Sequence, residues 1–434
     1  MVINPSFKPK DYLKITVLGF ALTALWQSLH SIVLPQRLLD IVPEAQKNTF
    51  LGILTFVGLA LAMFIQPIAG GLSDRSRAKW GRRRPYIMAG GLTAVILIPG
   101  IGWATGFTVL FIVYCLLQIV TNTAQGPYQA FIPEYVPAEK HGHASGLKAL
   151  MEVAGGAIFV MVASVFMDRY YVADNIKWFW GILALLMVVM AAAVAVTLFS
   201  VKETPVYHTI HRLSFSKKIS QEAREILVNP VMMWFLITRL LIYMGFTTIQ
   251  QFALYFLKDD IGVENPAEAT ARFLIYAVAG MLIIVWPAGY FSDKLGKKPI
   301  SIGAGLLGAI GILLIIISRD YNTILWSAGI IGMAMGAFNS ANWALAIDLA
   351  APGEEARYLG IANIATAGGA ALARAIGPGI DYFNGRHALL GYDLMLWICV
   401  VYFTAGALLM LSIRLRVKQT MGRGAFHNGQ DKQR

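Results

Sequence analysis

Twelve long apolar segments follow one another along this chain of 434 residues. A helix of about 20 apolar residues crosses the hydrocarbon core of a bilayer, whereas the strands of a membrane barrel would alternate apolar and polar residues. We therefore predict an all-α membrane protein with twelve transmembrane helices. The segments cover residues 12–33, 50–72, 86–106, 107–132, 145–167, 177–200, 231–257, 271–291, 299–317, 321–348, 358–383 and 391–413.

The composition excludes an ordinary soluble enzyme. Charged residues make up 14% of the chain and hydrophobic residues 57%, whereas soluble domains are about 25% charged. The sequence contains no nucleophile motif, no cluster of metal ligands and no phosphate-binding loop. We therefore expect neither an enzyme nor a bound cofactor or metal. Cys115 and Cys399 both lie in apolar segments, which argues against a structural disulfide.

The net charge of +12 is explained by topology. If the N-terminus is cytoplasmic, 26 of the 36 Lys and Arg residues lie in cytoplasmic segments and 8 on the opposite face. This bias is the positive-inside rule, so nucleic acid is not needed as a partner. We expect a multi-pass protein of the inner or plasma membrane with both termini in the cytoplasm. Its predicted parts are a six-helix bundle (1–200), a cytoplasmic linker (201–229), a second six-helix bundle (230–415) and a cytoplasmic tail (416–434).

An internal repeat relates the two sets of six segments. The sequence GGLSDR at 70–75 recurs as GYFSDK at 289–294. Further along, Pro85, Ala130, Glu134 and Gly146 match Pro299, Ala344, Asp348 and Gly360, each 214 residues later. A duplicated six-helix unit predicts two pseudo-symmetric bundles. In such proteins the substrate site lies between the halves, near the middle of the membrane.

The repeated motif resembles a known family. Residues 70–85, GGLSDRSRAKWGRRRP, are similar to the loop between helices 2 and 3 of the major facilitator superfamily. The ending WGRRRP is most similar to the sucrose–proton symporters and the related glycoside-pentoside-hexuronide symporters. NTAQGP at 122–127 is similar to the NTxQGP of plant sucrose carriers. The resemblance implies a secondary active transporter that works by alternating access, with a sugar or glycoside as substrate and a proton as coupling ion.

Polar side chains inside the apolar segments are candidates for the substrate site, because each is costly in a membrane unless it faces a cavity or a partner. In segment 107–132, amides recur at helical spacing on one face. Amides, hydroxyls and indoles suit a neutral polyol, although hydrogen bonding between helices would need the same residue types. The predicted substrate-binding residues are Gln27, His30, Gln118, Asn122, Gln125, Tyr243, Gln250, Asn339, Asn342, Trp343 and Arg374.

Glu152 is the predicted proton-coupling residue, because a carboxylate within a span can take up and release a proton. Plant sucrose carriers have an aspartate, implicated in coupling, where this chain has Gln118. Either Glu152 has taken that role, or transport is uncoupled or an exchange. The alternative for Glu152 is a structural pair with Lys148 or Arg374. Arg374 can instead clamp an anionic substrate, pair with Asp381 or donate to sugar hydroxyls.

A cytoplasmic gate is predicted at the two copies of the motif. Arg82, Arg83 and Arg84 can pair with Glu134 or Glu139, or meet anionic membrane lipid. A latch that breaks on opening is one interpretation, and arginines that only set topology are the other. The predicted gate residues are Asp74, Arg75, Arg82, Arg83, Glu134, Asp293, Lys294 and Asp348.

Two further functions stay open from sequence alone. One is an exporter or exchanger of an anionic or lipid-like solute. The other is a membrane sensor built on a transporter bundle, which the short polar tail does little to support. For the transporter we expect a small-molecule substrate and a monomer.

Overall fold

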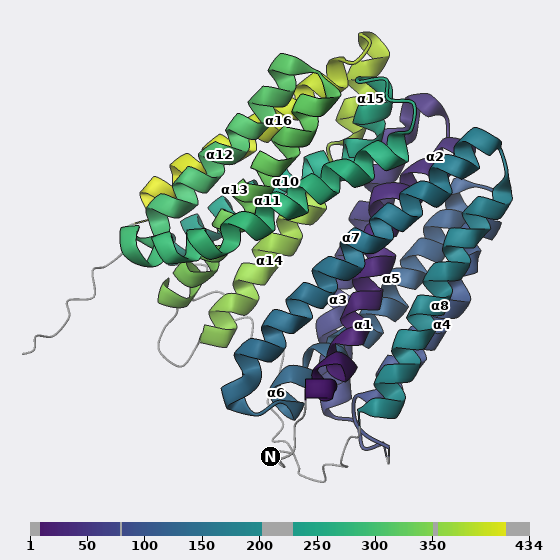
Figure 1. The fold of residues 1–434 in the computed structure, drawn as a ribbon, viewed down its shortest axis with the longest axis vertical. Helices are drawn as coiled ribbons and strands as arrows, with labels where there is room; N and C mark the ends of the chain where they lie inside the picture. The colour runs from purple at the N-terminus through teal and green to yellow at the C-terminus, as the bar shows by residue number, and fades with distance from the viewer. Residues whose placement is uncertain (1–8, 79, 202–228, 350–354, 414–434) are drawn as a thin grey trace, which may run out of the picture.

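A computed structural model describes residues 9–78, 80–201, 229–349 and 355–413. Within these ranges the chain is helical and forms no strand, which confirms the predicted all-α class. The predicted linker, apart from its end residues, and the predicted tail lie outside the described residues. Figure 1 shows two bundles side by side, one from each half of the sequence.

Eleven helical segments of the described chain are long and apolar enough to cross a membrane. In the N-terminal half the helices are α1 (Pro9–Ser28), α2 (Leu34–Ile41), α3 (Lys47–Asp74), α4 (Arg84–Trp103), α5 (Phe107–Gln129), α6 (Phe131–Tyr135), α7 (His141–Ala173) and α8 (Ile176–Ser200). In the C-terminal half they are α10 (Pro230–Asp259), α11 (Pro266–Leu295), α12 (Lys297–Ser318), α13 (Tyr321–Leu349), α14 (Glu355–Arg374), α15 (Gly377–Arg386) and α16 (Leu390–Leu409).

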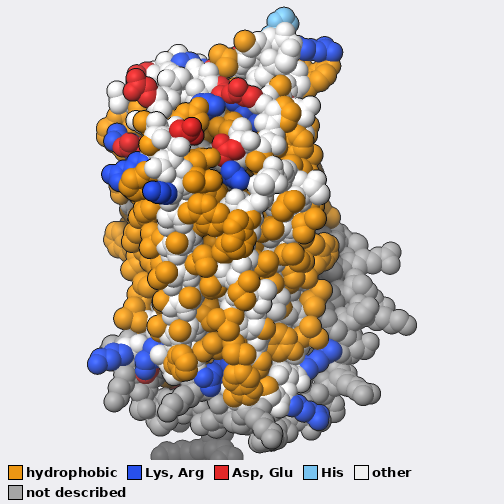
Figure 2. Space-filling model, turned by 90° about the vertical axis from the view of Figure 1, so that its right-hand side faces the viewer, with side chains coloured by type: hydrophobic (Ala, Val, Ile, Leu, Met, Phe, Trp, Pro, Cys, Tyr) orange, Lys and Arg blue, Asp and Glu red, His pale blue; other side chains and the backbone are white. Residues whose placement is uncertain are grey.

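The helices run between two ends of the molecule. We call the end where α1 begins and α3 finishes the N-terminal end, and the opposite end, where α7 finishes and α11 begins, the far end (Figure 1). In Figure 2 a broad hydrophobic belt separates charged side chains at the two ends, and acidic side chains gather on the far end of the visible face. This distribution is that of a protein surrounded by lipid.

The first span contains a π-helical turn. The turn η1 covers Leu29–Val33 and joins α1 to α2 without a break. Pro35 is the second residue after the turn, and because proline has no backbone N–H it cannot complete the regular i to i−4 ladder. A wider turn before it accommodates this loss, and π turns often mark functional sites. His30 lies within the turn.

The predicted segment 358–383 forms two helices instead of one. α14 ends at Arg374 and α15 begins at Gly377, with Pro378 at its start. Because Pro378 has no backbone N–H to donate to the carbonyl of Arg374, four residues earlier, the helical ladder is interrupted and the chain breaks at this point. The break lies against α3: a Cβ atom at Gly377 would sit 2.2 Å from the carbonyl oxygen of Asn48. Backbones of opposite halves thus approach closely here.

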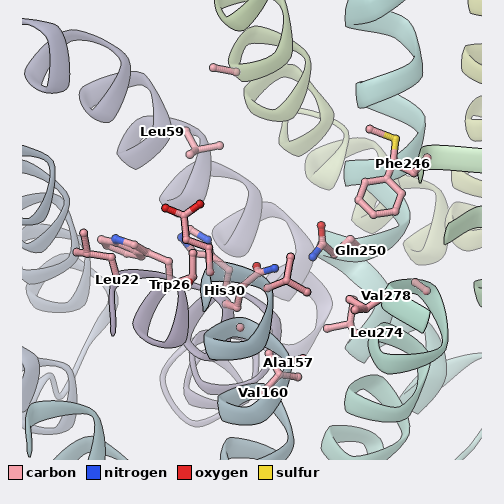
Figure 3. Close-up of a pocket in the computed structure, with 18 of the residues that line it drawn as sticks. Leu22, Trp26, His30, Leu59, Ala157, Val160, Phe246, Gln250, Leu274 and Val278 are labelled. Atoms are coloured by element: carbon pink, nitrogen blue, oxygen red, sulfur yellow. The ribbon is translucent and has the colours of Figure 1, made fainter. Parts of the chain in front are cut away.

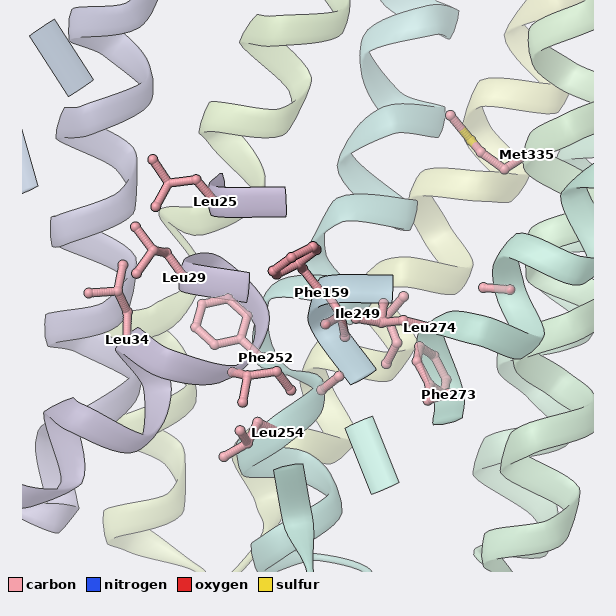
Figure 4. Close-up of a cluster of buried hydrophobic side chains, with 14 of the residues drawn as sticks. Leu25, Leu29, Leu34, Phe159, Ile249, Phe252, Leu254, Phe273, Leu274 and Met335 are labelled. Atoms are coloured by element: carbon pink, nitrogen blue, oxygen red, sulfur yellow. The ribbon is translucent and has the colours of Figure 1, made fainter. Parts of the chain in front are cut away.

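The two halves are joined at the far end. Figure 4 shows Leu25, Leu29 and Leu34 of the first span packed near Phe252 and Leu254 of α10. Between described residues, the hydrogen bonds and ion pairs that cross from one half to the other also lie at this end. They include Lys47 to Asp259 (2.7 Å), Asn48 to Asp381 (2.8 Å) and Tyr255 to the carbonyl of Pro35 (2.7 Å).

Candidate functional site

A cavity of about 590 Å³ lies between the two halves. Its walls come from the first span, α3, α5 and α7 on one side, and from α10, α11, α13 and α14 on the other. Figure 3 shows Trp26 and His30 on one side and Gln250 and Phe246 of α10 on the other. The polar lining consists mainly of amides, which are Gln27, Gln66, Gln118, Asn122, Gln125 and Gln250, together with Thr23, His30 and Glu152.

A hydrogen-bonded network fixes part of the N-terminal wall. The Gln118 amide donates to the Tyr114 hydroxyl (2.9 Å), and Nε2 of His30 lies 2.8 Å from the same hydroxyl. Asn122 donates to Gln118 (3.2 Å). Because these side chains hold one another, their remaining donors and acceptors are oriented before a ligand arrives.

Aromatic rings complete the wall. Trp26 lines the cavity and contacts His30 and Tyr114, with ring centroids 5.1 and 5.8 Å away. Phe246 lines the opposite side. Rings beside amides suit a solute with both hydroxyl groups and apolar C–H faces.

Glu152 is the one carboxylate among the described residues that line the cavity. Its side chain is 32% exposed, and the nearest cation is Lys148, one turn earlier on α7, at 3.6 Å. Lys148 also lies over the ring of Tyr128 (5.3 Å). The carboxylate therefore reaches the cavity and has only a loose ion pair.

Apart from Gln250, the predicted residues of α10 and α13 form a second cluster, outside the cavity lining. Arg239 donates to Asn342 (2.5 Å) and to Thr366 (2.8 Å). Tyr243 donates to Asn339 (2.5 Å). The Arg239 guanidinium also faces the rings of Tyr243 and Trp343. These four predicted substrate residues, Tyr243, Asn339, Asn342 and Trp343, contact one another here and do not line the cavity.

Arg374 is also outside the cavity lining. It is 6% exposed, and its guanidinium donates to the carbonyl of Ala370 on its own helix (2.5 Å). Neither of the alternative partners Glu152 and Asp381 forms an ion pair with it within the described ranges.

The predicted gate residues of the first half meet at the N-terminal end. Arg83, 4% exposed, bridges Asp74 and Glu134, each at 2.5 Å. Arg82 also pairs with Glu134 (2.6 Å), whereas Arg75 is exposed. Burial alone would lower the pKa of the Arg83 guanidinium, but its bond to Glu134 and the charges of Glu134 and Asp74 raise that pKa above its usual value.

The second half repeats this pair. Lys297 and Asp348 lie 2.5 Å apart, and they are the residues 214 positions after Arg83 and Glu134. Lys294 instead lies over the ring of Tyr290 (4.4 Å), and Asp293 is exposed. Each pair ties helices within its own half, so in this structure neither forms a latch between halves.

Sequence reasoning missed Gln66, Trp26 and Phe246 as cavity residues. Gln66 is an isolated amide in an apolar segment directly before Pro67, and that isolation is a signal that could have identified it. Trp26 directly precedes the predicted Gln27. Phe246 carries no such signal, because an aromatic residue in a span is as common on the lipid face.

Two helical bundles with a cavity between them whose largely apolar lining carries a group of polar side chains, closed at one end, define a class of multi-pass membrane protein, the transporters with two pseudo-symmetric halves. The family model described as the Major Facilitator Superfamily matches residues 12–374 and, again, 252–428. The chain belongs to this superfamily, as its motifs predicted, and this family and fold are those of transporters and not of enzymes.

Curated relatives match shorter stretches. Solute carrier family 45 member 4 of Mus musculus is 30% identical over 34% of this chain and 21% of its own length. Sucrose transport protein SUC4 of Arabidopsis thaliana is 30% identical over 20% of each chain. Minor myo-inositol transporter IolF of Bacillus subtilis is 27% identical over 37% of this chain and 33% of its own. The matched stretches thus span a third or less of these relatives.

Solved structures match across nearly the whole chain. A D-xylose–proton symporter has a TM-score of 0.73 at 17% identity, covering 94% of this chain and 98% of its own. The nucleoside transporter NupG has a TM-score of 0.73 at 14% identity, covering 93% and 98%. At these identities the likeness concerns the fold.

Proposed function

We propose that this protein is a secondary active transporter that carries a small neutral polyhydroxylated solute, a sugar or glycoside, by proton-linked symport. The observation that carries the proposal is the cavity lining: six amides beside aromatic rings, and no Lys or Arg among the described lining residues. Amides both donate and accept hydrogen bonds, as hydroxyl groups require. The substrates for which the similar sucrose and myo-inositol transporters are named support the same class.

The cavity residues are assigned as the substrate site. Gln27, His30, Gln66, Gln118, Asn122, Gln125 and Gln250 would bind hydroxyl groups, and Trp26 would pack on the apolar face of the ring. Tyr243, Asn339, Asn342, Trp343 and Arg374 are outside the cavity lining, so the proposal gives them no direct contact with substrate. This arrangement favours a neutral solute over the anionic one that Arg374 could have clamped.

Glu152 is assigned as the proton-coupling residue. The Glu152 carboxylate reaches the cavity and has one loose ion pair, with Lys148. It can therefore exchange a proton with water, and a bound substrate would change its surroundings. With the N-terminal end in the cytoplasm, as the basic residues indicate, the molecule is closed toward the outside. The pairs of Arg83 with Asp74 and Glu134, and of Lys297 with Asp348, would then position the cytoplasmic helix ends that move as the gate closes.

A ligand screen tests the substrate class. Purified protein is heated in the presence of sugars, glycosides, nucleosides or organic anions at two pH values. A ligand that binds the folded state stabilises it by about 2.7 kcal/mol at a hundred times its Kd, so we expect a raised melting temperature with sugars or glycosides. A shift with organic anions or nucleosides, and none with any sugar or glycoside, would contradict the proposal.

A further inference from the structure

The N-terminus of α11 is capped by a residue of the other half. Its own N-cap residue, Asn265, makes no side-chain capping bond. Instead the backbone N–H groups of Ala267 and Glu268 donate to the carboxylate of Asp168, at 3.2 and 2.7 Å. Asp168 lies on α7 near the far end of the molecule. A helix of the C-terminal half thus depends on the N-terminal half for its cap.

The N-terminus of α3 is capped in the reverse sense. Its N-cap residue, Gln46, also makes no capping bond. The backbone N–H of Thr49 donates to the carboxylate of Asp381 at 2.6 Å, and the Asn48 side chain donates to the other oxygen at 2.8 Å. Asp381 lies on α15, in the C-terminal half.

The internal repeat relates these two caps. Thr49 and Glu268 are 219 residues apart, which is also the separation of Asp74 and Asp293 in the repeated motif of the same two helices. Asp168 and Asp381 are 213 residues apart, one fewer than the 214 that relates Gly146 to Gly360. The duplicated unit therefore uses one device twice, with the donor and the acceptor of each cap in opposite halves.

Each cap satisfies backbone N–H groups at the start of a helix. The first N–H groups of a helix lack partners within it and carry the positive end of the helix dipole. Ala267 is fully buried and Asn48 is 1% exposed, whereas Thr49 and Glu268 are half-buried, so water has limited access to the two caps while the far end is closed. Asp168 and Asp381 form no ion pair within the described ranges. The charged residue near Asp168 is Glu268, which is also acidic and therefore does not neutralise it. Their counter-charge is the helix end itself.

We propose that Asp168 and Asp381 are paired gating residues, each holding the N-terminus of a helix of the opposite half, and that both caps must be released for the far end to open. The inference rests on the proposed alternating-access function. Opening exposes the two helix ends to water, which then replaces the carboxylates as acceptor. Closing restores both caps together, so the two pairs of helices move as one unit.

Spin-label distances across the far end test this inference without a substrate. In a full-length protein with Cys115 and Cys399 replaced by alanine, labels are attached at Lys177→Cys and Asn322→Cys, two exposed positions on α8 and α13. We expect Asp168→Ala and Asp381→Ala each to shift the distance distribution toward longer values, and the double variant to shift it further. Reconstituted transport is measured separately, so an absent uptake in the parent protein would contradict the proposed function and leave the distance result intact.

Asp320→Ala is the matched control, because Asp320 caps α13 within its own half through the N–H of Thr323 (3.0 Å). Asp320→Ala also removes a carboxylate that caps a helix, but it breaks no contact between the halves. We therefore expect the distribution of spin-label distances to be unchanged. Asp168→Asn and Asp381→Asn each keep one acceptor oxygen, so we expect a smaller shift of the label distance from them. They are used in place of any alanine variant that does not fold. Folded variants at Asp168 and Asp381 that match the Asp320 control would overturn the inference.

Discussion

At the scale of single residues, the amide wall of the cavity determines what can bind. Gln125 lines the cavity, and its side chain makes no hydrogen bond to another described residue, so its amide is available to a ligand. We expect Gln125→Leu to weaken sugar binding about tenfold, because an unmatched buried hydroxyl costs about 1–3 kcal/mol. Calorimetric titration of the purified variant with the ligand found by the screen measures this change.

Gln129 is the control for Gln125. It lies on the same helix, one turn further along, and its side chain is exposed and outside the cavity lining. Gln129→Leu should bind the ligand as the parent protein does. Equal losses in the two variants would show that the amide face of α5 acts through helix structure and not through the cavity.

The residues of α5 also show how much of the candidate site could be predicted from the sequence. Helical spacing places Gln118, Asn122, Gln125 and Gln129 on one face of α5. The first three line the cavity together, whereas Gln129 does not. The same reasoning on α10 and α13 placed Tyr243 and Asn339 with them, but these two bond each other. Periodicity gives the face of a helix, whereas the partner that satisfies a polar group depends on the neighbouring helices.

At the scale of elements, the packing of α1 on α7 depends on a glycine. A Cβ atom at Gly155 would sit 2.3 Å from the carbonyl oxygen of Phe20, so any other residue forces the two helices apart. We expect Gly155→Ala to lower the free energy of unfolding by about 1–3 kcal/mol, as overpacking does. Thermal unfolding of the purified protein in detergent measures it.

Gly146, also on α7, is the control for Gly155, because we expect its replacement by alanine not to lower stability. It is exposed, with nothing near its missing Cβ atom, and alanine is the better helix former by about 1 kcal/mol. Gly146→Ala should therefore leave the melting temperature unchanged or raise it. If both variants lost stability equally, the close approach of α1 and α7 would not be the cause.

Element boundaries were predicted where composition changes and were missed where it does not. The apolar segments located the spans, because charged turns separate them. The break between α14 and α15 lies inside one apolar segment, and only Pro378 marked it. The π turn at Leu29–Val33 likewise left no mark in the apolar pattern beyond Pro35.

At the scale of the whole molecule, the sequence predicted two bundles but not which end is closed. The repeat and the apolar segments establish the duplicated fold. Closure at the far end depends on contacts between residues far apart in sequence, such as Asp168 with Ala267 and Asn48 with Asp381. The same residues must also support the state in which the far end is open, so the sequence alone does not favour the closed far end over the open one.

The proposed coupling of proton movement to sugar transport depends on Glu152. The direct measurement is sugar uptake into proteoliposomes that carry an inward proton gradient, with Glu152→Gln compared with Glu139→Gln, an exposed glutamate at the N-terminal end outside the cavity. The parent protein and Glu139→Gln should accumulate sugar above its external concentration, whereas Glu152→Gln should exchange sugar but only equilibrate it. Accumulation by Glu152→Gln equal to that of the parent protein would contradict the claim.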